Sequence, residues 1–153
     1  MLQQLLIGGA IISSTLVAQV LFIGMAMTAL QRVGPRLITP PFALKTAMSL
    51  IGVVLWLVAG VSICACIWAS AFLYLGLFET LEAALYFSIV TFTTLGYGDI
   101  TLDTQWRLLS GLAAANGLFV FGLNTAFLVE FLSRLRNVQE NKAAANFGST
   151  IGN

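Results

Sequence analysis

The chain has 153 residues, of which 59% are hydrophobic and only 8% are charged, and its formal net charge at pH 7 is +1. A mean hydropathy of +0.96 excludes a soluble domain and indicates a protein of the lipid bilayer. Because the nearly neutral chain offers no excess of basic residues, we do not expect nucleic acid as a partner.

The first apolar stretch runs from about Leu2 to Leu30, which exceeds the roughly 20 residues that cross a bilayer as a helix. A cleaved signal peptide is the alternative, but such a peptide opens with basic residues and has a shorter apolar core. We therefore expect a retained transmembrane helix over residues 1–31. Its polar residues, Gln19 and the Ser13-Ser14-Thr15 cluster, could mark a polar path, but hydrogen bonding to a neighbouring helix is the preferred interpretation.

Residues 32–45 follow as a basic connection, and a second charge-free stretch from Thr46 to about Leu77 predicts another spanning helix. Cys64 and Cys66 lie two positions apart in this stretch, so they project from different sides of a helix and cannot form a local disulfide. We interpret them as apolar filling.

Residues 79–92 form a shorter apolar segment, which as a helix would span about 21 Å and could not cross a core of about 30 Å. A segment of this length fits a re-entrant helix, which is tolerated at membrane depth where protein or a water-filled cavity surrounds it. Glu79 and Glu82 stand at its start, where acids favour the positive end of a helix dipole. Its carboxyl end would then present partial negative charge, which favours a cation within the membrane.

The run Thr93-Thr94-Leu95-Gly96-Tyr97-Gly98-Asp99 comes directly after this segment. A loop whose successive carbonyls face one axis must alternate between ordinary and left-handed backbone, and glycine adopts the latter without steric cost. Gly96 and Gly98 supply that freedom, and potassium-channel filters use such loops to replace the water shell of the ion with carbonyl oxygens. The alternative is an ordinary Gly-rich turn between helices.

A third spanning helix is predicted over residues 106–135, with its apolar part from Leu108 to Val129. Gly111 and Gly122 are interpreted as packing positions, whereas Gly117 could be a packing position or a bending point. Glu130 could contribute to an acidic ring at the inner mouth, although an ordinary ion pair with Arg134 is preferred.

Residues 136–153 are too few for a ligand-binding domain, and we expect a short disordered tail. No helix carries the regularly spaced basic residues of a voltage sensor, so the gating stimulus stays open. Nothing in the sequence pairs a nucleophile with a base or resembles a metal site, so we expect neither an enzyme nor a cofactor.

The basic residues are distributed unevenly between the two ends of the predicted spans. Six of the seven flank the same side, and only Arg107 lies beside the filter run. Because cytoplasmic flanks collect Lys and Arg, we expect the N-terminus outside, the C-terminus in the cytoplasm and the filter entered from outside. Four acids would then surround the outer mouth and concentrate cations there: Glu79, Glu82, Asp99 and Asp103.

From Leu44 to about Leu135 the chain resembles the pore module of bacterial potassium channels, with an outer helix (46–77), a pore helix (79–92), a filter (93–99) and an inner helix (106–135). Besides the filter, the resemblance rests on Trp106-Arg107-Leu108 and on the residues Gly117, Leu118, Phe121, Gly122, Leu123, Asn124, Thr125 and Ala126. It implies an all-α integral membrane protein in which three transmembrane helices, a re-entrant pore helix and a filter loop assemble as a homotetramer. The helix over residues 1–31 is an addition to this module.

The resemblance also implies roles for individual residues. Potassium would be both the permeant ion and the bound metal. It would be held by the filter residues Thr94, Leu95, Gly96, Tyr97 and Gly98 through their carbonyls, with the Thr94 hydroxyl closing the innermost site. Thr93 and Asp99 would support the filter, Gly117 would be a hinge, and the cavity would be lined by Leu118, Phe121 and Thr125.

Leu95 and Val90 depart from the usual pattern of these channels, whereas Tyr86 follows it. Leu95 stands where Val or Ile is more usual, and Val90 stands where some such channels hold a glutamate, which puts filter inactivation through that acid in doubt. Tyr86 occupies the position of an aromatic donor, and we expect its hydroxyl to brace Asp99.

The sequence thus predicts a potassium-selective channel in the cell (inner) membrane, with a weakly selective cation channel or a non-conducting subunit with a relict filter as alternatives.

Overall fold

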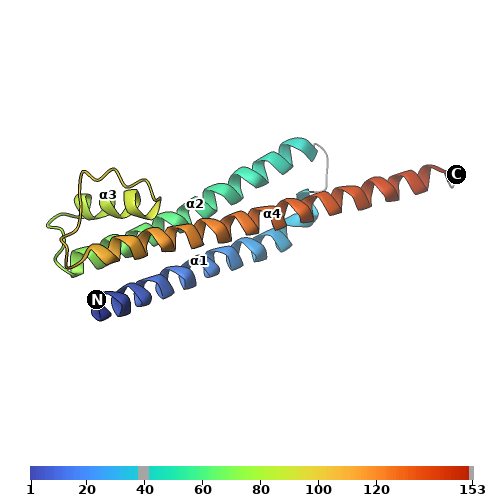
Figure 1. The fold of residues 1–153 in the computed structure, drawn as a ribbon. Helices are drawn as coiled ribbons and strands as arrows, with labels where there is room; N and C mark the ends of the chain where they lie inside the picture. The colour runs from blue at the N-terminus through green and yellow to red at the C-terminus, as the bar shows by residue number, and fades with distance from the viewer. Residues whose placement is uncertain (38–41, 152–153) are drawn as a thin grey trace.

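A computed structural model describes the backbone of residues 1–37 and 42–151, and the side chains of residues 1–30, 44 and 46–137. The described part folds into four helices: α1 (Leu2–Leu37), α2 (Phe42–Tyr74), α3 (Leu81–Phe92) and α4 (Arg107–Ile151). α1 contacts both α2 and α4. The short α3 also contacts α2 and α4, and it lies at the end of the molecule where the N-terminus is found (Figure 1). α1 and α3 flank the α2–α4 pair from opposite sides in this view.

Three of these helices are long and apolar enough to cross a membrane, over Leu2–Leu30, Thr46–Tyr74 and Arg107–Asn137. α3 has 12 residues and is too short to do so. The prediction of an all-α membrane protein with three spanning helices and one short apolar helix is confirmed.

Several helix boundaries differ from the predicted ones: α3 begins at Leu81 and not at residue 79, and α4 begins at Arg107 and not at residue 106. α1 continues to Leu37, and α2 begins at Phe42, so the helices extend into the predicted connection, of which residues 38–41 lie outside the described part. α2 ends at Tyr74, before the predicted residue 77. α4 is helical through Ile151, so the prediction of a disordered tail after residue 135 is wrong for residues 136–151. Hydropathy marks where the hydrocarbon ends, whereas a helix ends where its backbone hydrogen bonds stop.

α2 ends in a glycine-based cap that turns the chain toward α3. Gly76 has a φ of +69°, its N–H donates to the Leu73 carbonyl at 2.9 Å, and the Leu77 N–H donates to the Phe72 carbonyl at 3.0 Å. These two bonds form a Schellman motif, which satisfies carbonyls that the helix end leaves free. The motif sets where α2 stops.

An aromatic cluster fixes α3 against the end of α2. Phe72 of α2 lies 5.3 Å from Phe87 of α3 between ring centroids, and Phe78 of the connecting turn lies 5.2 Å from Phe87. Trp68 and Phe72 are fully buried, with ring centroids 5.6 Å apart. Edge-to-face and tilted ring contacts of this kind supply directional packing, which matters in a bilayer because lipid tails are as apolar as the side chains.

Polar side chains attach α1 to the other two spanning helices. The Asn116 amide of α4 donates to the Thr15 hydroxyl at 2.6 Å, and the Gln19 amide donates to the Asn124 side-chain oxygen at 2.6 Å. The Cys64 thiol of α2 lies 3.5 Å from the Thr15 carbonyl, which it contacts as a weak donor. The preferred interpretation of Gln19 and Thr15 as helix-to-helix hydrogen-bonding residues is confirmed.

The other polar and sulfur side chains of these spans also follow the predictions. Ser13 and Ser14 donate to carbonyls of their own helix, Gly9 and Ile11. Cys64 is buried and Cys66 is exposed, and both are free thiols, which confirms that the two cysteines face different directions.

Candidate functional site

α3 supports the loop that carries the Gly-Tyr-Gly-Asp run. Thr80 is its N-cap, and the Thr80 hydroxyl accepts a bond from the Ala83 N–H at 3.3 Å. Glu82 lies in the first turn, while Glu79 precedes the cap. The cap and the acid complement the positive end of the helix dipole, and the negative carboxyl end is directed at the filter run.

The backbone of the filter run alternates between ordinary and left-handed conformations. Thr94, Gly96 and Gly98 have φ values of +60°, +55° and +77°, which are alternate positions of the run. The alternation expected from Gly96 and Gly98 is confirmed. The sequence did not predict the left-handed backbone of Thr94, which is the one non-glycine residue with positive φ in the described part of the chain. A threonine in this region carries strain of the kind that clusters at functional sites.

The N–H groups of the run are directed toward α3. The Leu95 and Gly96 N–H groups both donate to the Val90 carbonyl, at 3.0 and 3.1 Å, and the Thr94 N–H donates to the Thr91 carbonyl at 2.9 Å. These bonds use carbonyls that the end of α3 leaves unpaired. The amides at the start of the run are therefore engaged by the end of the helix, and the carbonyls of the run stay available for a ligand.

The two threonines at the start of the run are used differently. The Thr93 hydroxyl donates to the Ile89 carbonyl at 2.8 Å, so it pairs with a carbonyl at the helix end, and its predicted role in supporting the filter stays a prediction. Among the described residues no hydrogen bond is found for the Thr94 hydroxyl, which leaves it available at the inner end of the run.

Tyr86 and Asp99 form the contact that the sequence predicted. The Tyr86 hydroxyl donates to the Asp99 carboxylate at 2.6 Å, which confirms the expected brace between α3 and the outer end of the run. This hydrogen bond is the main cause that lowers the pKa of Asp99 and that raises the pKa of Tyr86. The pair thus holds the carboxylate charged and the phenol protonated across ordinary pH.

The filter run lies at the surface of the single chain. All seven residues from Thr93 to Asp99 are exposed, including the side chains of Leu95 (55%) and Tyr97 (68%). A cavity of about 440 Å³ is lined by residues of the loop, of α3 and of the start of α4. A loop with this much exposed apolar surface is suited to burial against further protein.

α4 crosses the end of α3 at Gly117. A Cβ added to Gly117 would overlap the carbonyl oxygen of Phe92, so this position requires glycine for close packing. The structure therefore supports the packing interpretation of Gly117 over the hinge implied by the resemblance. Gly111 and Gly122 make no comparable contact with the described residues, and the prediction that they pack closely is wrong within the chain.

The predicted cavity residues of α4 share one exposed face. Leu118, Phe121 and Thr125 are all exposed and recur at helical spacing. The opposite face carries a buried stripe that meets α1 and α2: Asn116, Val120, Asn124, Phe127 and Phe131. The exposed face is thus free to line a path, while the buried stripe holds the helix in place.

Glu130 forms an ion pair rather than standing alone. The Arg134 guanidinium lies 2.6 Å from its carboxylate, one helical turn away, and both side chains are half exposed. This confirms the preferred interpretation of Glu130. Exposed pairs of this kind contribute about 0.3–0.5 kcal/mol.

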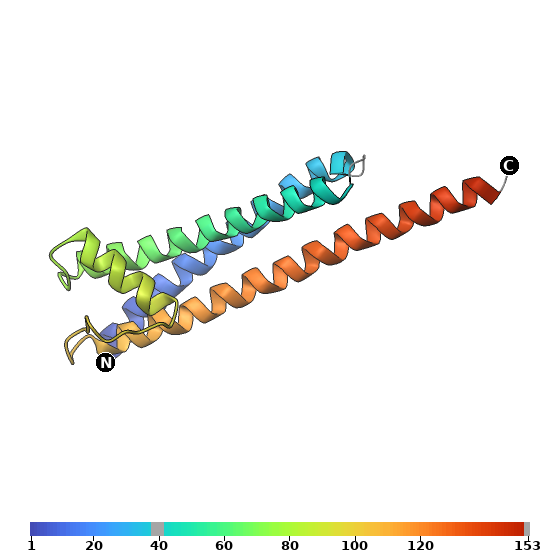
Figure 2. The ribbon, with the colours of Figure 1, turned by 90° about the horizontal axis from the view of Figure 1, so that it is seen from above.

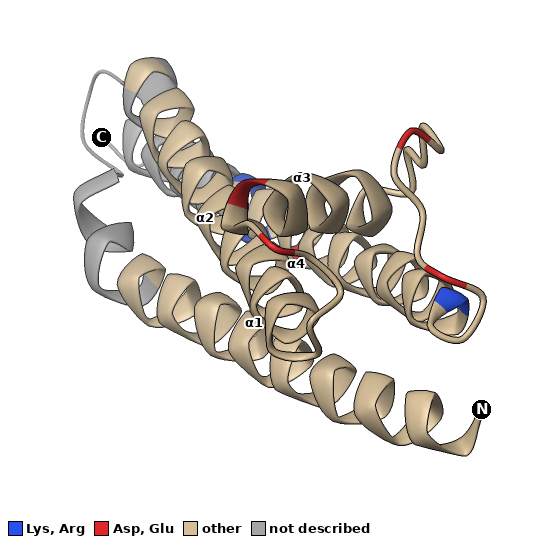
Figure 3. Cartoon of the chain, turned by 90° about the vertical axis from the view of Figure 1, so that its left-hand side faces the viewer, with Lys and Arg blue, Asp and Glu red and all other residues tan. Residues whose placement is uncertain are grey.

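The charged residues divide between the two ends of the molecule. The acids of α3 and of its flanking loops gather at the end that carries the filter run, as Figure 3 shows. The N-terminus lies at the same end, where the Gln4 amide donates to the Gln105 carbonyl before α4. Arg134 and Arg136 lie far along α4 toward the opposite end. The predicted basic residues 32, 36, 45 and 142 lie outside the described side chains.

Two comparisons with known proteins found matches to this chain. The family model described as "Ion channel" matches residues 51–134, which is more than half of the chain. The chain is 36% identical over 59 residues to the potassium voltage-gated channel protein Shal of Drosophila melanogaster, an alignment that covers 38% of this chain and 10% of that protein. The chain thus spans about a tenth of the length of this relative. No solved structure matches the chain.

Proposed function

Because this chain belongs to the ion channel family, we propose that it is a potassium-selective channel whose filter is formed by residues 94–98. The alternating backbone of Thr94, Gly96 and Gly98, with its N–H groups engaged by Val90 and Thr91, is the observation that carries this proposal. Such a loop can direct successive carbonyls at a dehydrated K⁺ ion, which is how potassium filters replace the hydration shell. The similarity to Shal, whose name describes a potassium channel, supports the same ion.

In this proposal each residue of the run has a defined role. The carbonyls of Thr94, Leu95, Gly96 and Tyr97 coordinate K⁺, and the Thr94 hydroxyl completes the innermost site. Tyr86 braces Asp99 so that the outer end of the run keeps its shape. Leu118, Phe121 and Thr125 line the water-filled path below.

A single copy supplies one wall of such a site, so we propose a homotetramer in the cell membrane. Four copies would surround a central axis with four filter runs and would cover the exposed side chains of Leu95 and Tyr97. The N-terminus and the filter would face outward, where the acids at this end attract cations.

Flux from liposomes tests this proposal against its alternatives. Purified protein reconstituted with K⁺ or Na⁺ gradients should carry K⁺ much faster than Na⁺. Equal rates for the two ions would identify a weakly selective cation channel, and no flux of either ion would identify a non-conducting subunit. Protein-free liposomes provide the baseline.

The substitution Gly96→Ala tests the filter assignment itself. Gly96 has a φ of +55°, and a Cβ there costs about 1–2 kcal/mol and redirects the neighbouring carbonyls. We expect K⁺ selectivity to be lost while the oligomer persists by native mass spectrometry. Gly9→Ala, at an ordinary helical position with open space around it, is the matched control. A selective Gly96→Ala channel would refute the assignment.

A further inference from the structure

Two amide side chains on α4 hydrogen-bond to α1 in the middle of the spanning segments. Asn116 and its partner Thr15 are both fully buried, and Gln19 is fully buried beside Asn124 at 8% exposure. Both bonds are 2.6 Å long. Separating such groups would leave unpaired polar atoms in hydrocarbon, which is far less favourable than exchanging one apolar contact for another.

The same part of α4 is also held from the side of α3. Gly117, next to Asn116, lies directly against the Phe92 carbonyl at the end of α3. Rotation or bending at Gly117 would therefore disturb the filter support on one side and the Thr15 hydrogen bond on the other. α4 is therefore held at Asn116 and Gly117 by α1 on one side and by α3 on the other.

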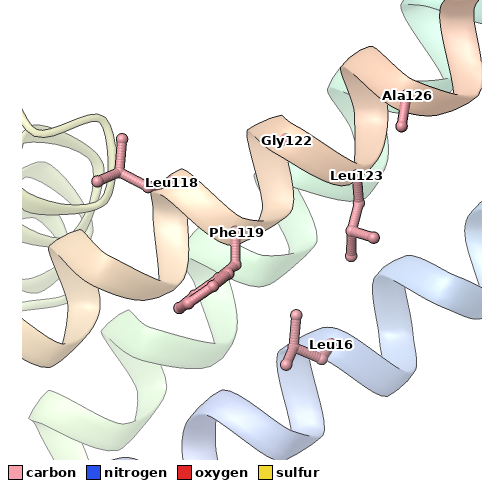
Figure 4. A pocket seen from close by; sticks show the side chains of 6 residues that line it. All are labelled: Leu16, Leu118, Phe119, Gly122, Leu123 and Ala126. Atoms are coloured by element: carbon pink, nitrogen blue, oxygen red, sulfur yellow. The ribbon is translucent and has the colours of Figure 1, made fainter.

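Between these two hydrogen bonds, Val120 of α4 is fully buried, and Leu16 of α1 packs against the core cluster that contains it. A groove of about 450 Å³ opens between the helices there, and its lining includes Leu16 of α1 and Phe119, Gly122, Leu123 and Ala126 of α4. Figure 4 shows the Leu123 side chain directed toward Leu16 and the Phe119 side chain on the same side of α4. The two amide pairs therefore add directional polar contacts to the apolar packing of Leu16 in this stretch of α1 and α4.

Beyond Asn124 the contacts change character. Phe127 packs in an apolar cluster with Ala26 of α1 and Leu57 of α2, and Phe131 is buried among apolar residues of the same stripe. Apolar contacts in a bilayer can be exchanged for contacts with lipid tails at little net cost. The last part of α4 extends past the other helices (Figure 2).

We propose that α1 is a brace for the inner helix: Thr15–Asn116 and Gln19–Asn124 hold α4 fixed from Asn116 to Asn124, and opening movements of α4 pivot on the C-terminal side of Asn124. This inference rests on the proposed function in that α4 lines the ion path. It assigns the added N-terminal helix a role, and it places the pivot away from Gly117.

Distance measurements by electron paramagnetic resonance in liposomes test the brace without requiring conduction. Spin labels would be placed at Gln3 of α1 together with either Phe119 or Ser133 of α4, in a Cys64→Ser and Cys66→Ala background, with labelled subunits diluted by unlabelled ones. We expect a narrow distance distribution for the Gln3–Phe119 pair and a broad one for Gln3–Ser133. In the variant Gln19→Leu with Asn124→Leu, the Gln3–Phe119 distribution should broaden.

Two further variants make the result specific. The exchange Gln19→Asn with Asn124→Gln keeps one donor and one acceptor and should keep the narrow distribution. Thr15→Val with Asn116→Leu removes the other hydrogen bond and should broaden it, even if the first variant does not fold. A wild-type Gln3–Phe119 distribution as broad as that of Gln3–Ser133, or one that neither leucine variant alters, would overturn the proposal.

Single-channel recording adds the functional readout. The leucine variants should change open probability by about 2- to 30-fold, the range of couplings between packed elements, while K⁺ over Na⁺ selectivity stays unchanged. Unaltered open probability in variants whose distances broaden would overturn the role in gating. Absence of K⁺ flux in the wild type would instead refute the proposed function, and the distance measurements would still decide whether α1 is a brace.

Discussion

At the scale of single residues, the Tyr86–Asp99 hydrogen bond makes a prediction about pH. The bond lowers the pKa of Asp99 below its ordinary value of 3.8 and raises the pKa of Tyr86 above 10.0. The hydrogen bond therefore makes its full contribution to the stability of the folded protein at pH values between these two ordinary pKa values. It is lost as pH falls through the lowered pKa of Asp99 or rises through the raised pKa of Tyr86.

Removing the Tyr86 hydroxyl should raise the lower pH limit of this range. In Tyr86→Phe the pKa of Asp99 should return toward its ordinary value, so the loss of K⁺ flux on external acidification should begin at higher pH than in the wild type. Flux from liposomes at a series of external pH values measures this. Tyr74→Phe, at an exposed tyrosine, is the control. If Tyr86→Phe matched the wild type in both flux and acid midpoint, the brace would have no part in filter stability.

Gly117 makes a second prediction at this scale. A methyl group there would overlap the Phe92 carbonyl, and overpacking of a fixed backbone contact costs about 1–3 kcal/mol. Gly117→Ala should therefore unfold at a lower temperature in detergent and lose K⁺ flux. Gly122→Ala meets open space in the chain and gains helix propensity of up to about 1 kcal/mol, so it should be at least as stable as the wild type. Equal thermal stability of the two variants would argue against the close contact.

How far the sequence predicts these residues depends on how local their contacts are. The Gly96 and Gly98 conformations follow from residue type, and the Tyr86–Asp99 bond follows from a resemblance over a short span of chain. The left-handed Thr94 has no such signal, because threonine does not ordinarily adopt positive φ. The Asn116 and Thr15 partners are separated by 101 positions, and a single sequence contains nothing that pairs them.

At the scale of elements, the end of α2 determines where the short helix begins. The Schellman motif at Gly76 turns the chain back so that Phe78 and Phe87 can meet. Hydropathy predicted the spanning segment to about residue 77, because Leu75 and Leu77 are apolar. The glycine conformation ends the helix earlier, since backbone hydrogen bonding and not hydropathy defines the boundary.

Gly76→Ala tests this cap. A Cβ at a φ of +69° costs about 1–2 kcal/mol, and no atom of the described chain lies close enough to add a clash. We expect a lower unfolding temperature in detergent. Gly52→Ala, at an ordinary position within α2 with open space around it, should raise that temperature slightly. A Gly76→Ala protein as stable as the wild type would mean that the turn relaxes into another conformation.

At the scale of the whole molecule, the arrangement follows from two kinds of information in the sequence. Hydropathy and length predicted three spanning helices and one helix too short to span, and these are confirmed. Which faces meet could not be predicted, because nearly every position in these helices is apolar and the periodicity that would mark a contact face is weak. The polar residues of α1 mark the face that meets α4, but this can be recognised only when their partners on α4 are known.

The same arrangement predicts how the chain lies in the membrane. The N-terminus and the loop before α4 are joined by the Gln4 to Gln105 hydrogen bond, so they must share one side. The bias of basic residues predicts that this side lies outside the cell. Single cysteines at Gln3, Asp103 and Ser133, in a Cys66→Ala background, can be probed on intact cells with a membrane-impermeant maleimide. Positions 3 and 103 should react and position 133 should react only after permeabilisation. The reverse pattern would invert the orientation, whereas a difference between positions 3 and 103 would contradict the arrangement of α1 beside α4.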